Sequence, residues 1–308
     1  MKVAIIGGGG RVGSCAAYAL QYGGIVSDII LNDIAESLVR GEALDLLHGS
    51  SLLHDQRICS GDMAEVVKAD IIIVTAGLRR KPDESRLDLI NRNVSLFSNI
   101  INDVKTAGLR EDTILVVVSN PVDILTYLAV QQTNLPPERI IGLGTLLDTT
   151  RFCSLIADTI KAAPTQLKAL ILGEHGDSMV PVWSSASCGG LSLENHPDLP
   201  ASTKTKIFEL TRQSGAEAIR LKGGAGWAVG TSVASLIHAI VLDQRRILPI
   251  SSLQTGAYGL SDICISVPTI VGRSGVVKHV TLELWPRELQ GLKKSADVLK
   301  DTIGKIQL

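Results

Sequence analysis

The sequence predicts an α/β protein in two parts: a doubly wound parallel sheet over residues 1–145 and a mixed α+β part over residues 146–308. Three observations lead to this fold class. In the first part, short apolar runs rich in β-branched residues alternate with longer amphipathic runs. A glycine-rich turn directly follows the first apolar run. After residue 145 the alternation gives way to long helical stretches and short alternating segments.

The composition excludes several classes of protein. With 30 Lys+Arg, 31 Asp+Glu and 3% aromatic residues, the chain lacks the basic field and the stacking surface of a nucleic-acid binder. Its five cysteines form no CxxC pair, which disfavours a metal site or a disulfide framework and indicates a cytoplasmic location. No apolar stretch reaches about 18 residues, so no membrane partner is expected. The length of 308 residues suits two domains.

The first part contains alternating candidate strands and helices. The expected strands are residues 3–6, 28–31, 70–74, 113–118 and 139–143. The expected helices lie between them, at residues 14–20, 37–49, 87–108 and 123–133. Continuous apolar runs of this length are typical of parallel strands that helices cover on both faces. Ligands of such sheets bind beyond the carboxyl ends of the strands, so the loops there are the place to look for chemistry.

The second part has a different order of elements. In sequence, they are a helix at 148–162, a strand at 167–172, a helical region at about 201–245, two antiparallel strand segments at 264–272 and 276–282, and a terminal helix. The terminal helix is expected to start near Pro286, because proline favours the first helical turn and apolar residues then recur every three or four positions.

The segment GGGGRVGS, which follows the first strand, contains the pattern Gly8-x-Gly10-x-x-Gly13. The first glycine permits a tight turn, the second lets a pyrophosphate approach the backbone, and the third lets helix and strand pack closely. The helix that follows presents free N–H groups to the phosphates. Glycines also serve plain turns, but this context predicts a dinucleotide site that includes Arg11 and Val12.

Asp33 indicates which dinucleotide binds. It lies 20 residues after Gly13, just beyond the second expected strand. A carboxylate there accepts hydrogen bonds from ribose hydroxyls and repels a 2′-phosphate, which favours NAD over NADP. The alternative is that Asp33 caps the helix that follows it.

A candidate acid–base pair lies in the second part. His175 follows the strand at 167–172, and Asp148 and Arg151 are three residues apart on a predicted helix, so they share a face. If that face meets His175, Asp148 can hold one imidazole nitrogen and raise the pKa of the ring. Arg151 can then grip a substrate carboxylate with two hydrogen bonds. The alternative for Asp148 and Arg151 is an ion pair on the helix surface.

Two further loops follow strands of the first part. Asn120 ends the strand at 113–118 and either orients a substrate oxygen or the nicotinamide amide, or forms a turn. The stretch LRRKPDESR, residues 78–86, contains four cations, and Pro82 excludes a continuous helix. It is either a solvated turn or a basic loop that receives an anion.

Six segments together resemble the lactate/malate dehydrogenase family of NAD-dependent 2-hydroxy-acid oxidoreductases over essentially the whole chain. They are GGGGRVGS, TAGLRRKPDESR, VSNPVD, LLDTTRF, GEHGDSMVPVWS and LKGGAGWAVG. The resemblance implies a Rossmann-type doubly wound parallel sheet followed by a mixed α+β catalytic domain. It also implies NAD as cofactor, no metal, and a homotetramer or homodimer.

The resemblance assigns a role to each candidate residue. It implies that His175 is the acid/base, that Asp148 orients it, and that Arg151 binds the substrate carboxylate. Arg86 matches the arginine that polarises the carbonyl, and it belongs to a lid that closes over the bound substrate and excludes water. Asn120 matches a substrate contact, and because all these residues are present, a dinucleotide-binding protein without catalysis is disfavoured.

The choice of substrate depends on few positions. Arg80 stands six residues before Arg86. By resemblance to the family, the residue at this position reads the far end of the substrate, and it is Gln in lactate dehydrogenases and Arg in malate dehydrogenases. A buried Arg80 without a second carboxylate would lack a partner, which favours a dicarboxylate substrate. Ala225 and Met179 also resemble the malate enzymes. We therefore expect a malate dehydrogenase of the tricarboxylic acid cycle, with L-lactate dehydrogenase or a promiscuous 2-hydroxy-acid dehydrogenase as the alternative.

Overall fold

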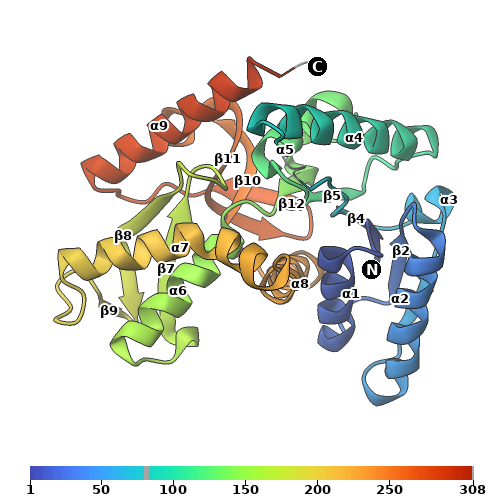
Figure 1. Ribbon diagram of the computed structural model, residues 1–308, viewed down its shortest axis with the longest axis horizontal. Helices are drawn as coiled ribbons and strands as arrows, with labels where there is room; N and C mark the ends of the chain where they lie inside the picture. The colour runs from blue at the N-terminus through green and yellow to red at the C-terminus, as the bar shows by residue number, and fades with distance from the viewer. Residues whose placement is uncertain (80–82, 307–308) are drawn as a thin grey trace.

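A computed structural model describes residues 1–79 and 83–306 (Figure 1). Arg80, the residue expected to read the far end of the substrate, lies outside the described residues. The described chain forms a nine-stranded sheet and a three-stranded sheet. The N-terminal strands lie at one side of Figure 1, and the C-terminal helix crosses the opposite side.

Six parallel strands form the first part of the large sheet. They are β1 (Lys2–Ile6), β2 (Asp28–Asn32), β3 (Arg57–Ser60), β4 (Ile71–Val74), β5 (Ile114–Val117) and β6 (Ile140–Gly142). Their order is β3-β2-β1-β4-β5-β6, so the direction of winding reverses between β1 and β4. This confirms the expected doubly wound parallel sheet and places its ligand crevice beyond the carboxyl ends of β1 and β4.

Helices cover both faces of this sheet. On one face lie α1 (Arg11–Gly23), α2 (Glu36–Gly49) and α8 (Trp227–Val241). On the other lie α3 (Met63–Val66), α4 (Arg86–Thr106), α5 (Val122–Gln132) and α9 (Pro286–Ile303). Ile71 and Ile73 of β4 point into the first of these layers, and Ile72 and Val74 point into the second. All four are fully buried, and each contributes roughly 1.5–3 kcal/mol relative to an exposed side chain.

The second part adds strands to the same sheet. β10 (Arg246–Thr255), β11 (Ser261–Gly272) and β12 (Gly275–His279) are antiparallel, and β10 joins the edge of β6. Gly142 of β6 permits this junction, because a Cβ there would lie 2.3 Å from Thr126 Oγ1 and 2.9 Å from Ser251 Cβ. The expected antiparallel strands of the second part therefore extend the parallel sheet.

The remaining elements are the three strands of the small sheet and two helices. They are α6 (Leu146–Ile160), β7 (Leu167–Leu172), β8 (Val180–Cys188), β9 (Leu191–Ser192) and α7 (Ala201–Lys222). Short 3₁₀ helices occur at Ser50–Leu52, Pro137–Arg139, Pro164–Gln166 and Ala257–Gly259. Within the described ranges, no helix combines the length and the apolar character needed to cross a membrane.

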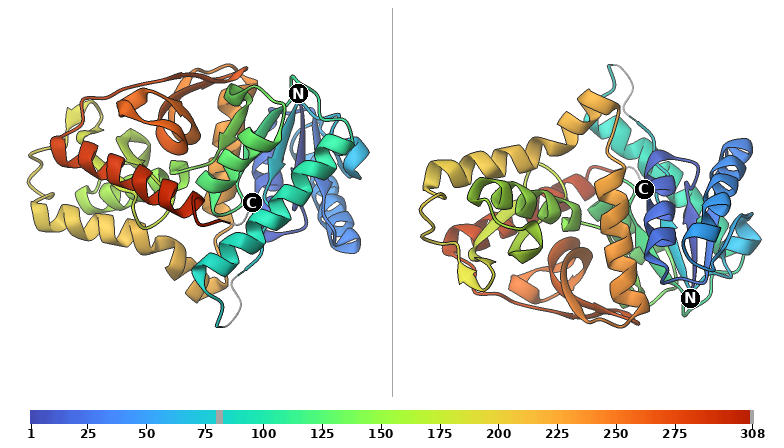
Figure 2. Two further views of the ribbon diagram at one scale, coloured as in Figure 1. Left: turned by 90° about the horizontal axis from the view of Figure 1, so that it is seen from above. Right: turned by 90° about the horizontal axis from the view of Figure 1, so that it is seen from below.

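The apolar helix α8 buries one face inside the chain. It runs alongside α1, as the two views of Figure 2 show. Gly230 of α8 allows this approach, since a Cβ there would lie 2.6 Å from the carbonyl oxygen of Cys15. The sequence leaves open whether the apolar stretch of this helix is buried or forms an interface. Packing against α1 and the sheet accounts for its buried face.

Candidate active site

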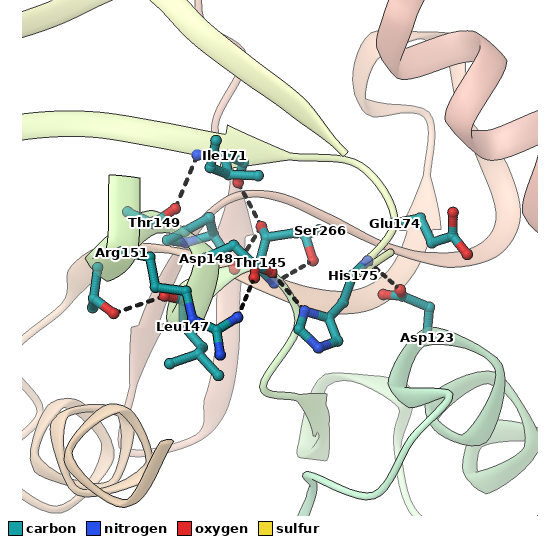
Figure 3. Close-up of polar contacts among 12 residues, drawn as sticks. Asp123, Thr145, Leu147, Asp148, Thr149, Arg151, Ile171, Glu174, His175 and Ser266 are labelled. Carbon is teal, nitrogen blue, oxygen red and sulfur yellow. Dashed lines mark hydrogen bonds and ion pairs between the residues drawn. The ribbon is translucent and has the colours of Figure 1, made fainter. Parts of the chain in front are cut away.

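The loop after β7 carries His175, and three successive backbone N–H groups anchor it. Gly173 N donates to Ser266 O of β11 at 3.0 Å, and Glu174 N donates to Ser295 Oγ of α9 at 2.8 Å. His175 N donates to Asp123 Oδ2 of α5 at 2.8 Å (Figure 3). Three separate elements therefore determine where the histidine stands.

The structure brings His175 and Asp148 together. The distance between His175 Nδ1 and Asp148 Oδ2 is 2.5 Å. The first turn of α6 is tied to the end of β7 by two side chains, because Thr145 Oγ1 donates to Ile171 O and Thr149 Oγ1 accepts from Ile171 N. Asp148 lies between these threonines, so the same bonds aim its carboxylate at the imidazole (Figure 3).

The charges of the site shift the pKa values of this pair. Burial alone would lower the pKa of His175, but the charge and hydrogen bond of Asp148 more than offset it, so the pKa is raised. Burial would raise the pKa of Asp148, and His175 and Arg151 more than offset that effect, so it is lowered. Both shifts favour an imidazolium–carboxylate pair, with Nδ1 donating to Asp148 and Nε2 directed away from it.

Arg151 lies beside the same carboxylate. Its Nη1 is 3.0 Å from Asp148 Oδ1, and its side chain is 16% exposed while that of Asp148 is 1% exposed. The guanidinium faces α7 at Gly215, where a Cβ would lie 3.7 Å from Nη1. The predicted face of the helix thus presents Asp148 to His175 and holds Arg151 next to both.

In the structure, Arg86 pairs with two acids of the histidine loop. Arg86 is the first residue of α4, after the N-cap Ser85, and its ion pairs are with Asp177 at 2.9 Å and Glu174 at 3.5 Å. These acids flank His175 in the sequence, so Arg86 lies against the outside of the histidine loop. The acidic residue Glu84, which the sequence sets close to Arg80, pairs with Arg92 at 2.6 Å.

Asn120 lies at the carboxyl end of β5, and its side chain is exposed. The neighbouring Ser119 is buried and donates to Ala76 O of the loop after β4 at 2.5 Å. The two strand-end loops are therefore joined to each other. This position is compatible with either a substrate contact or a cofactor contact.

The glycine loop between β1 and α1 has the backbone that close packing requires. A Cβ on Gly13 would lie 2.3 Å from Gly7 O, and one on Gly8 would lie 2.9 Å from Leu31 Cβ. Gly10 is the N-cap of α1, and the first turn of α1 carries no acidic residue. The N–H groups of Gly7 to Gly10 have acceptors within the protein, so it is the first turn of α1 that offers N–H groups and a positive helix end to an anion.

Asp33 is tied to this loop. Its Oδ2 accepts from Gly9 N and its Oδ1 accepts from Ala35 N, both at 3.1 Å. Ala35 is the N-cap position of α2, so Asp33 supports the start of that helix from two residues away. A carboxylate beside the glycines suits the ribose of NAD, and the residues of this end of the sheet fit that cofactor.

Arg11 and Val12, within the glycine motif, have other contacts in the structure. Arg11 Nη1 donates to Lys222 O at 2.7 Å and to Gly224 O at 3.0 Å, which joins α1 to the turn after α7. Val12 is partly buried and packs against the core beneath α1. A contact between either residue and the cofactor remains a prediction.

Several residues of the site were not predicted from the sequence. Asp123, Ser295 and Gly7 are the main ones: the first two anchor the histidine loop, and Gly7 adopts a φ of 88° at the turn. One signal for Asp123 was available, since it is an acid at the start of the otherwise apolar stretch DILTYLAV. Across the described residues, no group of three or more His, Cys, Asp or Glu side chains could hold a metal ion.

Family models match both parts of the chain. Residues 1–142 match the model described as lactate/malate dehydrogenase, NAD binding domain. Residues 145–307 match the model described as lactate/malate dehydrogenase, alpha/beta C-terminal domain. The expected fold class, the expected family and the NAD cofactor are confirmed.

Individual relatives are similar over their full lengths. An L-lactate dehydrogenase from Synechococcus sp. (strain JA-3-3Ab) is 40% identical over 100% of both chains. Another from Acetivibrio thermocellus is 39% identical over 100% of this chain and 98% of its own. The crystal structure of minor L-lactate dehydrogenase from Enterococcus mundtii in the ligands-bound form is 36% identical, covers 100% of this chain and 98% of that chain, and has a TM-score of 0.95.

These relatives correct the expected substrate. The prediction of a malate dehydrogenase is wrong, because relatives at 36–40% identity over at least 98% of the chain are each named L-lactate dehydrogenase. A place in the tricarboxylic acid cycle is likewise unsupported. That prediction depended on single side chains, and one of them, Met179, is 7% exposed and packs with Trp183 in the core beside β8. The chain belongs to the lactate/malate dehydrogenase family and carries its NAD-binding domain.

Proposed function

We propose that this protein is an NAD-dependent L-lactate dehydrogenase that interconverts pyruvate and L-lactate. The observation that carries the proposal is the hydrogen bond between His175 Nδ1 and Asp148 Oδ2, which leaves Nε2 to exchange a proton with substrate. The names of the full-length relatives support the choice of pyruvate and lactate over other 2-hydroxy acids. The cofactor, when bound at the glycine loop, would supply the hydride as NADH in reduction and accept it as NAD⁺ in oxidation.

His175 performs the proton transfer. In pyruvate reduction, protonated Nε2 donates its proton to the carbonyl oxygen, and the resulting hydroxyl belongs to lactate. In lactate oxidation, neutral Nε2 takes the hydroxyl proton. Asp148 keeps Nδ1 protonated throughout and stabilises the imidazolium, so the ring presents one nitrogen to the substrate in either direction.

Arg151 binds the substrate carboxylate in this proposal. Its side chain is mostly buried beside Asp148, where one Nη1 contact restrains the guanidinium plane. Two parallel hydrogen bonds from a guanidinium fix both the position and the plane of a carboxylate. Such a restraint would hold the adjacent carbonyl carbon within reach of His175 and the cofactor.

Arg86 and Asn120 complete the substrate contacts. Arg86 must exchange its ion pairs with Asp177 and Glu174 for the carbonyl oxygen when the lid, residues 78–90, closes. A cation there stabilises the charge that develops on the oxygen. Asn120, exposed at the end of β5, orients the substrate oxygen or the nicotinamide amide.

The test compares kcat/KM for pyruvate and for oxaloacetate with NADH, under the same conditions. The proposal requires pyruvate to be the better substrate. His175→Gln should abolish both reactions and leave NADH binding intact. A kcat/KM for oxaloacetate that exceeds the value for pyruvate would refute the proposed substrate. Full activity in His175→Gln would refute the proposed acid/base.

We also propose a homotetramer in the cytoplasm. Exposed apolar side chains on α1 and α2 support an oligomer: Tyr18, Tyr22, Leu38, Leu44 and Leu47 are each at least 46% exposed. All five cysteines are free, which agrees with a reducing compartment. Sedimentation velocity should give a species of about four times 32.7 kDa. A dimer or a monomer at micromolar concentration would contradict the tetramer.

A further inference from the structure

Asp123 is a buried carboxylate that the proposed proton transfer does not use. It lies in the first turn of α5 and is 3% exposed. One oxygen, Oδ2, accepts the backbone N–H of His175 at 2.8 Å. The other, Oδ1, makes no hydrogen bond of normal geometry among the described residues, and the buried hydroxyl of Ser251 on β10, likewise without such a bond, lies close enough to stabilise its charge. A buried charge is costly unless it is paired and hydrogen-bonded, and only one oxygen of Asp123 has a well-formed hydrogen bond.

We propose that Asp123 is a second carboxylate of the acid–base centre, a positioning residue that holds the main chain of His175 and favours its imidazolium form by charge. The inference rests on the proposed function, since it assigns the imidazole its part in lactate dehydrogenation. It also extends that function, because the centre then contains two carboxylates instead of one.

The two carboxylates hold different parts of the histidine. Asp148, on α6, accepts from the ring nitrogen Nδ1, and Asp123, on α5, accepts from the backbone nitrogen (Figure 3). The first contact fixes the rotation of the ring, and the second fixes where the ring is carried. A displacement of about 1 Å in a reacting group can reduce a rate about 100-fold, so the main-chain contact matters to the chemistry.

The charges around His175 determine how Asp123 acts on it. Asp148 and Asp123 raise the pKa of His175, whereas burial and Arg151 lower it. Asp123 itself is faced by Ser251 of β10 and by the His175 loop, which includes Glu174, and it lies near the Cys264 thiol of β11. A charge in this buried setting acts more strongly than one at the surface, because little water screens it.

The pKa of Asp123 lies close to neutral pH. Burial raises its pKa to about 6, although Ser251 and the His175 N–H partly offset the effect. Below that pH the carboxyl is neutral, and an O–H at Oδ1 has the Ser251 hydroxyl as its neighbouring acceptor. Asp123 and His175 therefore titrate as a coupled pair. Loss of the Asp123 charge makes the imidazolium less favourable.

The experiment separates charge from position. Asp123→Asn keeps an oxygen for His175 N and turns the amide N–H groups towards Ser251, so it removes only the charge. NMR titration of His175, with the ring labelled at Cε1 and assigned through His175→Gln, should show a midpoint at lower pH in Asp123→Asn. The basic limb of kcat/KM for pyruvate should move with it. Asp123→Ala, which removes both contributions, should lose roughly 100-fold in kcat/KM.

The matched control is Asp70→Asn. Asp70 lies just before β4, at the amino end of the sheet, where it accepts from Lys2 N at 2.8 Å. This substitution should leave the His175 midpoint unchanged. An unchanged midpoint in Asp123→Asn, with a lowered one in Asp148→Asn, would overturn the role of the charge. Wild-type kcat/KM in Asp123→Ala would overturn the role in positioning.

The NMR midpoint requires no turnover, so it tests Asp123 independently of the substrate. If the wild-type protein fails to reduce pyruvate and Asp123→Asn still lowers the midpoint, the proposed function fails and the second carboxylate stands. If pyruvate is reduced and the midpoint does not move, the proposed function stands and the role of the Asp123 charge fails.

Discussion

Arg86 Nη1 lies 2.9 Å from Asp177 Oδ2, so an acid two residues after His175 holds the cation proposed for the carbonyl. Asp177→Asn should leave Arg86 with only its longer pair to Glu174 and so make lid closure easier. The pair is 64% and 80% exposed, and such pairs contribute at most about 1 kcal/mol, so KM for pyruvate should fall by up to about fivefold. Steady-state kinetics at low salt measure it, with Asp158→Asn, from an exposed pair on α6, as the control.

Salt provides an independent check on this pair. Higher ionic strength screens exposed charges, so it should lower KM in the wild type and have less effect in Asp177→Asn. If Asp177→Asn raises KM instead, the Arg86–Asp177 pair belongs to the productive conformation and not to the open one.

Asp148→Asn should decrease kcat/KM for pyruvate by roughly 10²–10⁴-fold, because the ring loses the partner that fixes its orientation and charge. The wild-type pKa of His175 is raised, and reduction needs the imidazolium. The rate of pyruvate reduction is therefore at its maximum below that pKa and declines as the pH rises through it. In Asp148→Asn the decline in the rate of reduction should begin at lower pH. The neutral imidazole of His175 that lactate oxidation needs should likewise form at lower pH. A pH–rate profile with an unmoved midpoint would contradict this assignment.

Asp33→Asn should weaken NADH binding by about 10- to 100-fold, because hydrogen bonds to a charged acceptor contribute about 1.5–3 kcal/mol. The same change removes the repulsion of a 2′-phosphate, so affinity for NADPH should rise. Titration of NADH fluorescence measures both. Asp28→Asn, at the amino end of the strand β2 that precedes Asp33, should leave both affinities unchanged. Equal losses for NADH and NADPH would indicate a structural role for Asp33.

Gly13→Ala should destabilise the nucleotide-binding part and weaken NADH binding. Its Cβ would lie 2.3 Å from Gly7 O, so the backbone of the turn must shift, and overpacking of this kind costs roughly 1–3 kcal/mol. Gly41→Ala, in the interior of α2, is the matched control, because no atom lies within 4 Å of its added Cβ. That variant should gain about 0.5–1 kcal/mol. Thermal melts with and without NADH distinguish the two results.

The sequence predicts some elements of this fold for clear physical reasons. β4 is a continuous run of buried isoleucine and valine, which is typical of a strand covered on both faces. α9 begins at Pro286, as expected from the proline and the apolar period that follows. These signals are local, and packing around them does not oppose them.

Other elements could not be predicted from local signals. β3 is an edge strand with one buried residue, Ile58, so it lacks an apolar pattern. β10 contains Pro249, which lies opposite Pro268 of β11, and proline within a run argues against a strand. Its long pairing with the next strand, β11, outweighs that cost. Its pairing with β6 joins Ser251 to Gly142, which is far away in the sequence.

The candidate site divides in the same way. The spacing of Asp148 and Arg151 predicts a shared helix face, and the structure has both beside His175. The contact of Asp123 with His175 joins positions 52 residues apart, and no pattern within one segment indicates it. Which acid meets which backbone nitrogen is decided by how α5 and the β7 loop pack together.

The anchoring of the histidine loop also determines when, during synthesis, the acid–base centre can assemble. The bonds from Gly173 N to Ser266 O and from Glu174 N to Ser295 Oγ require β11 and α9, so a nascent chain that has just emerged through residue 175 lacks two of the three anchors of its histidine. The glycine loop and Asp33, which are proposed to bind NAD, all precede residue 145 and so emerge earlier during synthesis. An exchanged α9 that carries no hydroxyl at position 295 therefore disturbs the acid–base centre, although neither His175 nor Asp148 lies on α9.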